Sequence, residues 1–271
     1  MAFRLSDIDE TQAPLLDHLI ELRSRLLRAF LGLAVAFAVC FYFRQEILNF
    51  LVQPLIQAGQ QKLIYTKLYG QFFVELKVAL FGAFFLSFPI IANQVWAFVA
   101  PGLYAKEKAA FLPFLLATPV LFVMGGALAY YVVMPTAFHF FLGFQSNSDG
   151  LIIEALPNSE DYLSLVMQFI LAFGLSFLLP VLLMLLNKAG IVSRDQLVSA
   201  RRYVIVAVFI VAAVVTPPDV ISQLMLAIPL WALFEGSLLL MLLSERRSKT
   251  GEALADVALE NGGVSPKGPA E

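Results

Sequence analysis

The chain has 271 residues, of which 60% are hydrophobic and 14% are charged, and its net charge is −2. Soluble domains carry roughly 25% charged residues, so a water-soluble fold of this length is excluded. The slightly acidic balance, without a dominant basic patch, excludes a nucleic-acid partner. A single cysteine, Cys40, excludes an internal disulfide, and two histidines give little material for a zinc site or a catalytic triad.

Six apolar runs follow one another along the chain, at residues 26–43, 72–99, 111–134, 163–186, 204–215 and 220–243. A helix needs about 20 mainly apolar residues to cross the hydrocarbon core of a bilayer. The fifth run is shorter than that and ends at the sequence Thr216-Pro217-Pro218-Asp219. Two interpretations follow: a hairpin of two spans, or one re-entrant segment followed by one span.

The distribution of Lys and Arg favours six spans. If the N-terminus is cytoplasmic, fourteen basic residues fall in cytoplasmic segments, and only Arg44, Lys62 and Lys67 fall in outer segments. By the positive-inside rule, we expect an all-α polytopic membrane protein with six transmembrane helices and both termini in the cytoplasm. Prolines in or beside the spans suit a curved bundle, and kinks or loops are predicted at Pro54, Pro89 and Pro101.

Three regions are expected. Residues 1–25 form a cytoplasmic amphipathic segment, residues 26–245 form the transmembrane domain, and residues 246–271 form a polar tail predicted to be disordered. The first apolar run is longer than the core of a secretory signal and is interpreted as an uncleaved span.

Polar residues stand out in two segments near the predicted cytoplasmic surface. In the first, Glu21 and Arg25 have the i,i+4 spacing of an ion pair, typical of a surface anchor helix. The second runs from Trp96 to Lys108, where Pro101 and the glycine after it are expected to end the helix. From spacing alone, both segments are explained by interfacial structure.

Two further positions lie in the last two runs. Asp219 is expected to cap the sixth helix. Gln223 lies one turn into the membrane, and its amide is expected to form a hydrogen bond with a partner helix. Glu235 leaves two interpretations open: a functional carboxylate inside the membrane, or an interfacial partner of Arg201 or Arg202.

Four segments together resemble the signatures of the TatC family. They are 18–26 (HLIELRSRL), 94–104 (QVWAFVAPGLY) followed by Glu107, 216–223 (TPPD and Gln223), and 227–235 (AIP followed by Phe234 and Glu235). The similarity extends over roughly residues 12 to 245, in the family's order. It implies a glove-shaped receptor in the bacterial inner membrane, with short fifth and sixth spans, that binds Arg-Arg signal peptides of folded proteins. It further implies single-span TatA and TatB partners, a homo-oligomeric complex, contact with membrane lipids, transport driven by the proton motive force, and neither cofactor nor enzymatic chemistry.

The resemblance assigns site residues. Glu21 and Glu107 are expected to bind the two signal-peptide arginines, because carboxylates pair with guanidinium groups in bidentate geometry. Leu22, Arg23 and Phe98 support that site. A second set, Gln223, Asp219, Pro217 and Pro218, is expected to contact the partner helix. One departure concerns the fourth span, where Leu178 stands at a position that is polar in many family members.

Two other functional classes fit the sequence less well. A small-solute transporter or channel would need polar residues converging from several spans at mid-membrane, and the third run offers no charge. A rhomboid-like serine protease would need a nucleophile motif, and no Gly-x-Ser-x-Gly is present.

Overall fold

The fold is helical throughout, apart from one small hairpin. The structure is a computed structural model that describes residues 6–60, 62–103, 108–148, 151–188, 190–216 and 219–262; within them, side chains are described for 19–60, 62–98, 114–145, 154–188, 190–216 and 219–243. The helices are α1 (Ser6–Tyr42), α2 (Arg44–Gln57), α3 (Gly70–Leu103), α4 (Lys108–Leu128), the π-helical segment η1 (Ala129–Val133), α5 (Met134–Leu142), α6 (Ser159–Ser176), α7 (Leu179–Lys188), α8 (Arg194–Ser199), α9 (Arg201–Val215) and α10 (Val220–Gly262). The strands β1 (Ser146–Ser148) and β2 (Leu151–Ile153) pair antiparallel.

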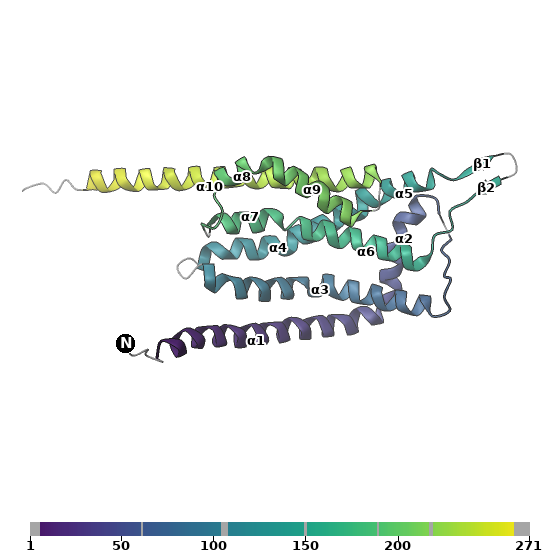
Figure 1. Cartoon of the computed structure of the whole chain (residues 1–271), viewed down its shortest axis with the longest axis horizontal. Coiled ribbons are helices and arrows are strands. Elements are labelled where there is room, and N and C mark those ends of the chain that lie inside the picture. Colours follow the sequence, from purple (N-terminus) through teal and green to yellow (C-terminus); the bar gives the residue numbers. More distant parts are fainter. Residues whose placement is uncertain are drawn as a thin grey trace, which may run out of the picture.

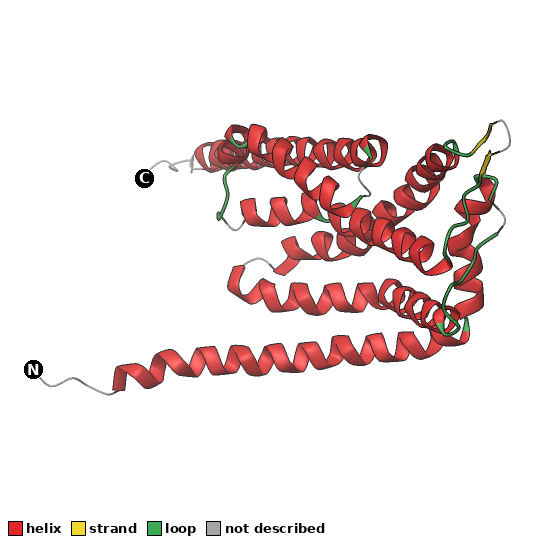
Figure 2. Cartoon of the chain, turned by 45° about the vertical axis from the view of Figure 1, so that its right-hand side comes forward, coloured by secondary structure: helices red, strands yellow, loops and turns green. Residues whose placement is uncertain are grey.

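The long helices run side by side along one axis (Figures 1 and 2). One end of the bundle, the hairpin end, carries α2 and the β1–β2 hairpin. At the other end, the termini end, the first residues of α1 and the last turns of α10 project from the bundle (Figure 1). The all-α prediction is therefore confirmed, with β1–β2 as a small addition.

In the described part of the chain, five stretches are long and apolar enough to cross a membrane. They are Leu19–Tyr42, Gly70–Phe98, Phe114–Leu142, Ser159–Lys188 and Val220–Leu243. α9 has only 15 residues, which makes it about 22 Å long and shorter than the roughly 30 Å of a hydrocarbon core. This short helix corresponds to the predicted fifth span, and the predicted sixth span corresponds to Val220–Leu243.

Proline bends some of these helices and leaves others continuous. The predicted 163–186 run is broken between α6 and α7, just before Pro180, which lacks the N–H needed to continue the ladder. A π-helical turn likewise precedes Pro135. By contrast, α2 continues past Pro54 and α3 past Pro89. The prediction that α3 ends at Pro101 is wrong by two residues, since α3 runs to Leu103.

Two segments differ from the sequence prediction. Residues 44–57 form α2, which was not predicted because this stretch mixes polar and apolar side chains and is too short to cross a membrane. α10 continues to Gly262, so the prediction of disorder is wrong for residues 246–262. Alanine, leucine and glutamate dominate residues 252–260 and favour a helix despite their polar composition.

The core is tightest where α4 crosses α6. Phe122 is fully buried and stacks on Phe88 of α3, with ring centroids 3.7 Å apart. A Cβ atom at Gly125 would collide with the carbonyl oxygen of Phe173, and one at Gly174 would lie 2.7 Å from the Phe122 ring. These two glycines allow the helix backbones to approach each other.

Candidate functional site

The packing of α1 on α3 fixes the position of Glu21. The helices are antiparallel, and Gly32 lies against Ile90 while Cys40 lies against Gly82. Eleven residues before Gly32 is Glu21, and eleven after Ile90 is Pro101. This register places Glu21 level with the last turn of α3, at the point where the chain enters the segment that contains Glu107.

The carboxylate of Glu21 is half-exposed and locally oriented. Its Oε1 accepts a hydrogen bond from Nε of Arg25 at 2.9 Å, and Nη2 of Arg25 contacts the same oxygen. The predicted i,i+4 ion pair is thus confirmed. Leu22 and Arg23 are exposed beside it. The α1 face around Glu21 is therefore accessible and carries both charge signs.

The end of α3 is tied to α4 by one hydrogen-bond chain. The indole Nε1 of Trp96 donates to Oγ1 of Thr118 at 2.8 Å, and that hydroxyl donates to the carbonyl of Phe114 at 2.7 Å. Phe98, two residues later, is half-buried. Glu107 lies outside the described residues, as do the contacts of Pro101, so the predicted pairing of Glu21 with Glu107 stays a prediction.

The start of α10 holds the second predicted set. The backbone N–H of Ser222 donates to Oδ1 of Asp219 at 2.7 Å, which confirms Asp219 as the helix cap. The other carboxylate oxygen of Asp219 and the hydroxyl of Ser222 are buried without a hydrogen-bond partner among the described residues. Gln223 is half-buried, and its Nε2 donates to the carbonyl of Phe209 on α9 at 3.3 Å. Pro217 and Pro218 lie outside the described residues.

Glu235 forms an ion pair with Arg201, the partner that one of the two interpretations expected. Its Oε2 lies 2.7 Å from Nη2 of Arg201, with side-chain exposures of 29% for Glu235 and 47% for Arg201. The pair joins α10 to the first residue of α9.

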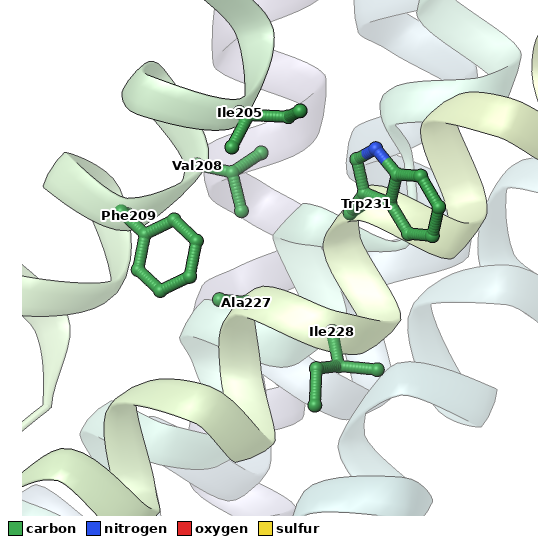
Figure 3. A pocket seen from close by; sticks show the side chains of 6 residues that line it. All are labelled: Ile205, Val208, Phe209, Ala227, Ile228 and Trp231. Atoms are coloured by element: carbon green, nitrogen blue, oxygen red, sulfur yellow. The ribbon is translucent and has the colours of Figure 1, made fainter. Parts of the chain in front are cut away.

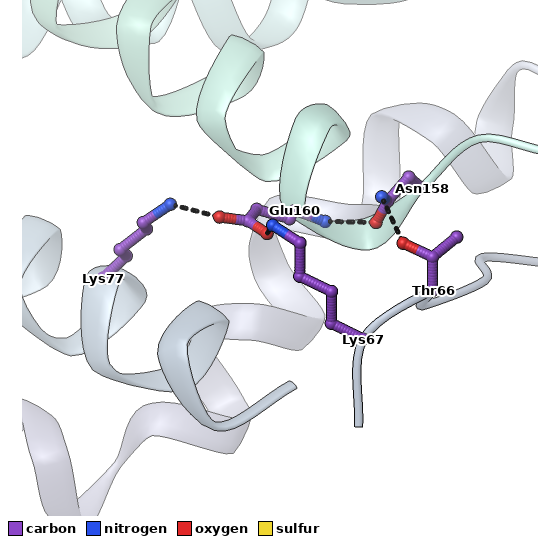
Figure 4. A network of polar contacts seen from close by, with 5 residues as sticks. All are labelled: Thr66, Lys67, Lys77, Asn158 and Glu160. Atoms are coloured by element: carbon purple, nitrogen blue, oxygen red, sulfur yellow. Dashed lines mark hydrogen bonds and ion pairs between the residues drawn. The ribbon is translucent and has the colours of Figure 1, made fainter. Parts of the chain in front are cut away.

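The hairpin end contains a network that sequence reasoning did not identify (Figure 4). Glu160, in the first turn of α6, lies 2.9 Å from Nζ of Lys77 and 3.7 Å from Nζ of Lys67. The side chain of Asn158 accepts a hydrogen bond from the Glu160 backbone and caps α6. Glu75, beside Lys77, pairs instead with Arg44 at 2.8 Å. The partners in these ion pairs are 31 (Arg44 and Glu75) to 93 residues (Lys67 and Glu160) apart in the sequence, so no local spacing could reveal them.

Most buried hydroxyls of the described residues are satisfied inside their own helices. Ser87, Thr118, Thr216 and Ser237 each donate to a carbonyl three or four residues earlier in their own helix. The hydroxyls of Ser159 and Ser222 have no hydrogen-bond partner among the described residues. A hollow of about 340 Å³ beside α2, α3 and α4 is open on one side and is lined by apolar side chains and the two tyrosines Tyr130 and Tyr131.

Comparison with known proteins decides the family. The sequence model of the family described as "Sec-independent protein translocase protein (TatC)" matches residues 17–229. The chain belongs to the TatC family.

Several TatC proteins are similar along most of their length. The TatC of Magnetococcus marinus is 50% identical over 246 residues, which is 90% of this chain and 89% of that protein. The TatC of Escherichia coli K12 is 41% identical over 230 residues, 84% of this chain and 87% of that protein. A crystal structure described as "Twin Arginine Translocase Receptor- TatC in DDM" has a TM-score of 0.74 and 35% identity, and the match covers 82% of this chain and 98% of that one.

Membership of the TatC family explains the architecture as a whole. The chain is a multi-pass membrane protein and a component of a Sec-independent protein translocase. The resemblance based on four short motifs is thereby confirmed at the level of the family.

Proposed function

We propose that this TatC-family chain is the receptor that binds the paired arginines of twin-arginine signal peptides on folded proteins. The observation that carries the proposal is the position of Glu21, a half-exposed carboxylate level with the end of α3. The related crystallised TatC proteins are described as twin-arginine translocase receptors, which supports the same role. The function is transport rather than catalysis.

Glu21 and Glu107 would share the two arginines. A guanidinium group forms two parallel hydrogen bonds with a carboxylate, whereas a lysine ammonium offers only a point charge. Glu21 is already able to hold such a group, because it pairs with Arg25 in the free chain. An incoming arginine would therefore compete with Arg25 for the carboxylate, with Leu22, Arg23 and Phe98 at its sides.

The test is photo-crosslinking from position 22 of the full chain, in membranes, to a signal peptide that carries Arg-Arg. We expect Glu21→Gln to weaken binding about tenfold or more, since a hydrogen bond to a charged group contributes roughly 1.5–3 kcal/mol. Glu107→Gln should act alike, and a Lys-Lys peptide should crosslink poorly. Glu46→Gln, an exposed carboxylate at the hairpin end, is the matched control. Unchanged crosslinking in both Glu21→Gln and Glu107→Gln would show that the assignment is wrong.

The start of α10 would contact the single-span partners TatA and TatB. Polar side chains within a membrane favour hydrogen bonds to another helix. The Gln223 amide makes a long 3.3 Å hydrogen bond to the carbonyl of Phe209, and one buried polar atom each of Asp219 and Ser222 lacks a partner within the described part of the chain. Gln223→Leu should abolish co-purification of a TatB-type helix, while Gln45→Leu on exposed α2 should not. Full co-purification with Gln223→Leu would remove this contact from the proposal.

The distribution of Lys and Arg predicts how the chain is oriented in the membrane. α9 would complete six spans in the bacterial inner membrane, with the termini end in the cytoplasm, as the excess of Lys and Arg in the predicted cytoplasmic segments indicates. Copies of the chain would assemble into a homo-oligomeric complex with their partners. Cysteine labelling from either side of the membrane, at position 62 and at position 202, tests the orientation directly.

The rival function, a small-solute transporter or channel, has weaker support. In such proteins, polar side chains from several helices line a path through the membrane, whereas four of the buried hydroxyls in the described helices bond within their own helices. Solute uptake into vesicles that contain the chain alone would favour the rival.

A further inference from the structure

A narrow apolar groove lies between α9 and α10 (Figure 3). Its volume is about 160 Å³, and all the side chains that line it are apolar apart from one indole N–H. Val208 and Ala227 form its floor and are buried, whereas the rim residues are 39–60% exposed. The rim consists of Ile205, Phe209, Ile228 and Trp231. The groove is thus open along one side of the bundle.

A cation lies at the end of this groove nearest the start of α9. Arg202 is exposed, its Cζ lies 4.8 Å from the centroid of the Tyr203 ring, and its Nη2 donates to the Tyr203 hydroxyl at 3.1 Å. Its neighbour Arg201 is neutralised by Glu235. Arg202 shares a second, shallow hollow beside α9 with Asp195 of α8, but the Asp195 carboxylate lies 3.9 Å from Arg194, and among the residues with described side chains no carboxylate lies within 4.0 Å of Arg202. This guanidinium is therefore available to an external anion.

Helical periodicity aligns the cation with the groove. Residues 202, 205 and 209 have the i, i+3, i+7 spacing that shares one helix face, so Arg202 heads the same stripe as Ile205 and Phe209. Trp231 lies one turn before Glu235, hence close to the level of the Arg201–Glu235 pair. Tryptophan and tyrosine are enriched at the depth of lipid headgroups.

The order of apolar and charged surface favours one occupant. The groove is lined by apolar side chains, and the guanidinium of Arg202 lies beyond one end of it. A phospholipid presents the same order, an anionic headgroup followed by an apolar chain. Arginine favours phosphate because its fork donates two hydrogen bonds, and basic pockets between membrane helices bind anionic headgroups.

We infer that this groove is a binding site for one anionic phospholipid. The phosphate contacts Arg202 beside the hydroxyl of Tyr203, and one acyl chain lies along Ile205, Phe209, Ile228 and Trp231. The lipid covers the α9–α10 seam, which the chain itself leaves open.

The test uses the full chain, without partners, in nanodiscs that contain phosphatidylglycerol with a photoactivatable group in the acyl chain. We expect mass spectrometry to locate the label on the rim residues of the groove. Arg202→Gln should reduce that labelling about fivefold, the factor that one basic residue contributes at an anionic lipid surface. Phosphatidylcholine has no net charge. When it carries the same photoactivatable group, it should label the groove of the unchanged chain only weakly, to the same extent as phosphatidylglycerol labels the Arg202→Gln variant.

Arg28→Gln is the matched control. Arg28 is an exposed arginine in the same half of the molecule, but it lines neither the groove between α9 and α10 nor the second hollow beside Arg202. Its labelling should equal that of the unchanged chain. Equal labelling by the two lipids, or equal loss in both variants, would overturn the specific site in favour of general membrane contact. A groove that stays unlabelled would overturn the proposal and leave a partner helix as the occupant.

Discussion

The two ends of the bundle are held together in different ways. At the hairpin end, hydrogen bonds and ion pairs join elements far apart in sequence: Tyr162 donates to the carbonyl of Leu51, 111 residues away, and Gln60 to that of Ala155, 95 residues away. At the termini end, the Glu21–Arg25 pair spans four residues, the Trp96–Thr118 hydrogen bond 22 and the Arg201–Glu235 pair 34. Among the described residues, the polar contacts at the hairpin end therefore reach over longer stretches of sequence than those at the end that carries the proposed receptor site.

The largest effect should come from the helix crossing between the two ends. Gly125→Ala places a Cβ against the carbonyl oxygen of Phe173, and overpacking of this kind costs about 1–3 kcal/mol. Thermal unfolding in detergent should show the loss. Gly236→Ala is the control: its Cβ would meet nothing within 4 Å, so the helix should gain about 0.5–1 kcal/mol. Equal midpoints for the two variants would contradict the crossing as described.

The next effect should appear at the hairpin end. Tyr162→Phe removes the 2.9 Å hydrogen bond from the tyrosine hydroxyl to the carbonyl of Leu51 and leaves that buried acceptor unsatisfied. The expected cost is about 1–3 kcal/mol. Tyr131→Phe, which changes a tyrosine that is 68% exposed, should leave the unfolding midpoint unchanged. A negligible shift for Tyr162→Phe would mean that the long-range bonds do not stabilise this end.

A smaller and more local effect is expected at Arg44. Arg44→Gln removes its ion pair with Glu75, whose carboxylate is only 18% exposed, and should cost about 1 kcal/mol. Hydrogen exchange should become faster in α2 and at the start of α3, while α9 and α10 stay as protected as before. Lys62→Gln, an exposed cation nearby without an ion pair among the described residues, should leave exchange unaltered. Faster exchange spread over the whole chain would contradict the separation into two ends.

The smallest effect should follow Glu235→Gln. Both partners of the Arg201–Glu235 pair are partly exposed, and such pairs contribute about 0–1 kcal/mol. The unfolding midpoint should fall less than it does in Tyr162→Phe. A larger fall would show that the termini end is also cross-linked, and the contrast between the two ends would disappear.

Sequence reasoning succeeded where the signal was local. Apolar runs located the long helices, the spacing of Glu21 and Arg25 predicted their ion pair, and Asp219 was predicted as a helix cap. Motifs also identified the family, because four short patterns in order are specific together. Each of these inferences depends on residues close together in the chain.

The features that the sequence did not predict either join residues far apart in the chain or lie in segments whose composition gives no clear signal. The Glu160 network and the Arg44–Glu75 pair join residues that only the folded chain brings together. α2 carries no clear periodic signal, and the end of α10 is polar but rich in helix formers. The open groove beside α9 depends on the shape of two packed helices, which no single helix pattern records.

The attachment of α1 has a mechanical consequence. Its contacts with α3 centre on Gly32, Ala36 and Cys40, whereas the first half of its apolar stretch is largely exposed. From Glu21 to Tyr42 the helix measures about 32 Å at 1.5 Å per residue. Because α1 is one continuous helix, a load that pulls on Glu21 is transmitted along its length to the small-residue contacts with α3 and to α2 at the hairpin end.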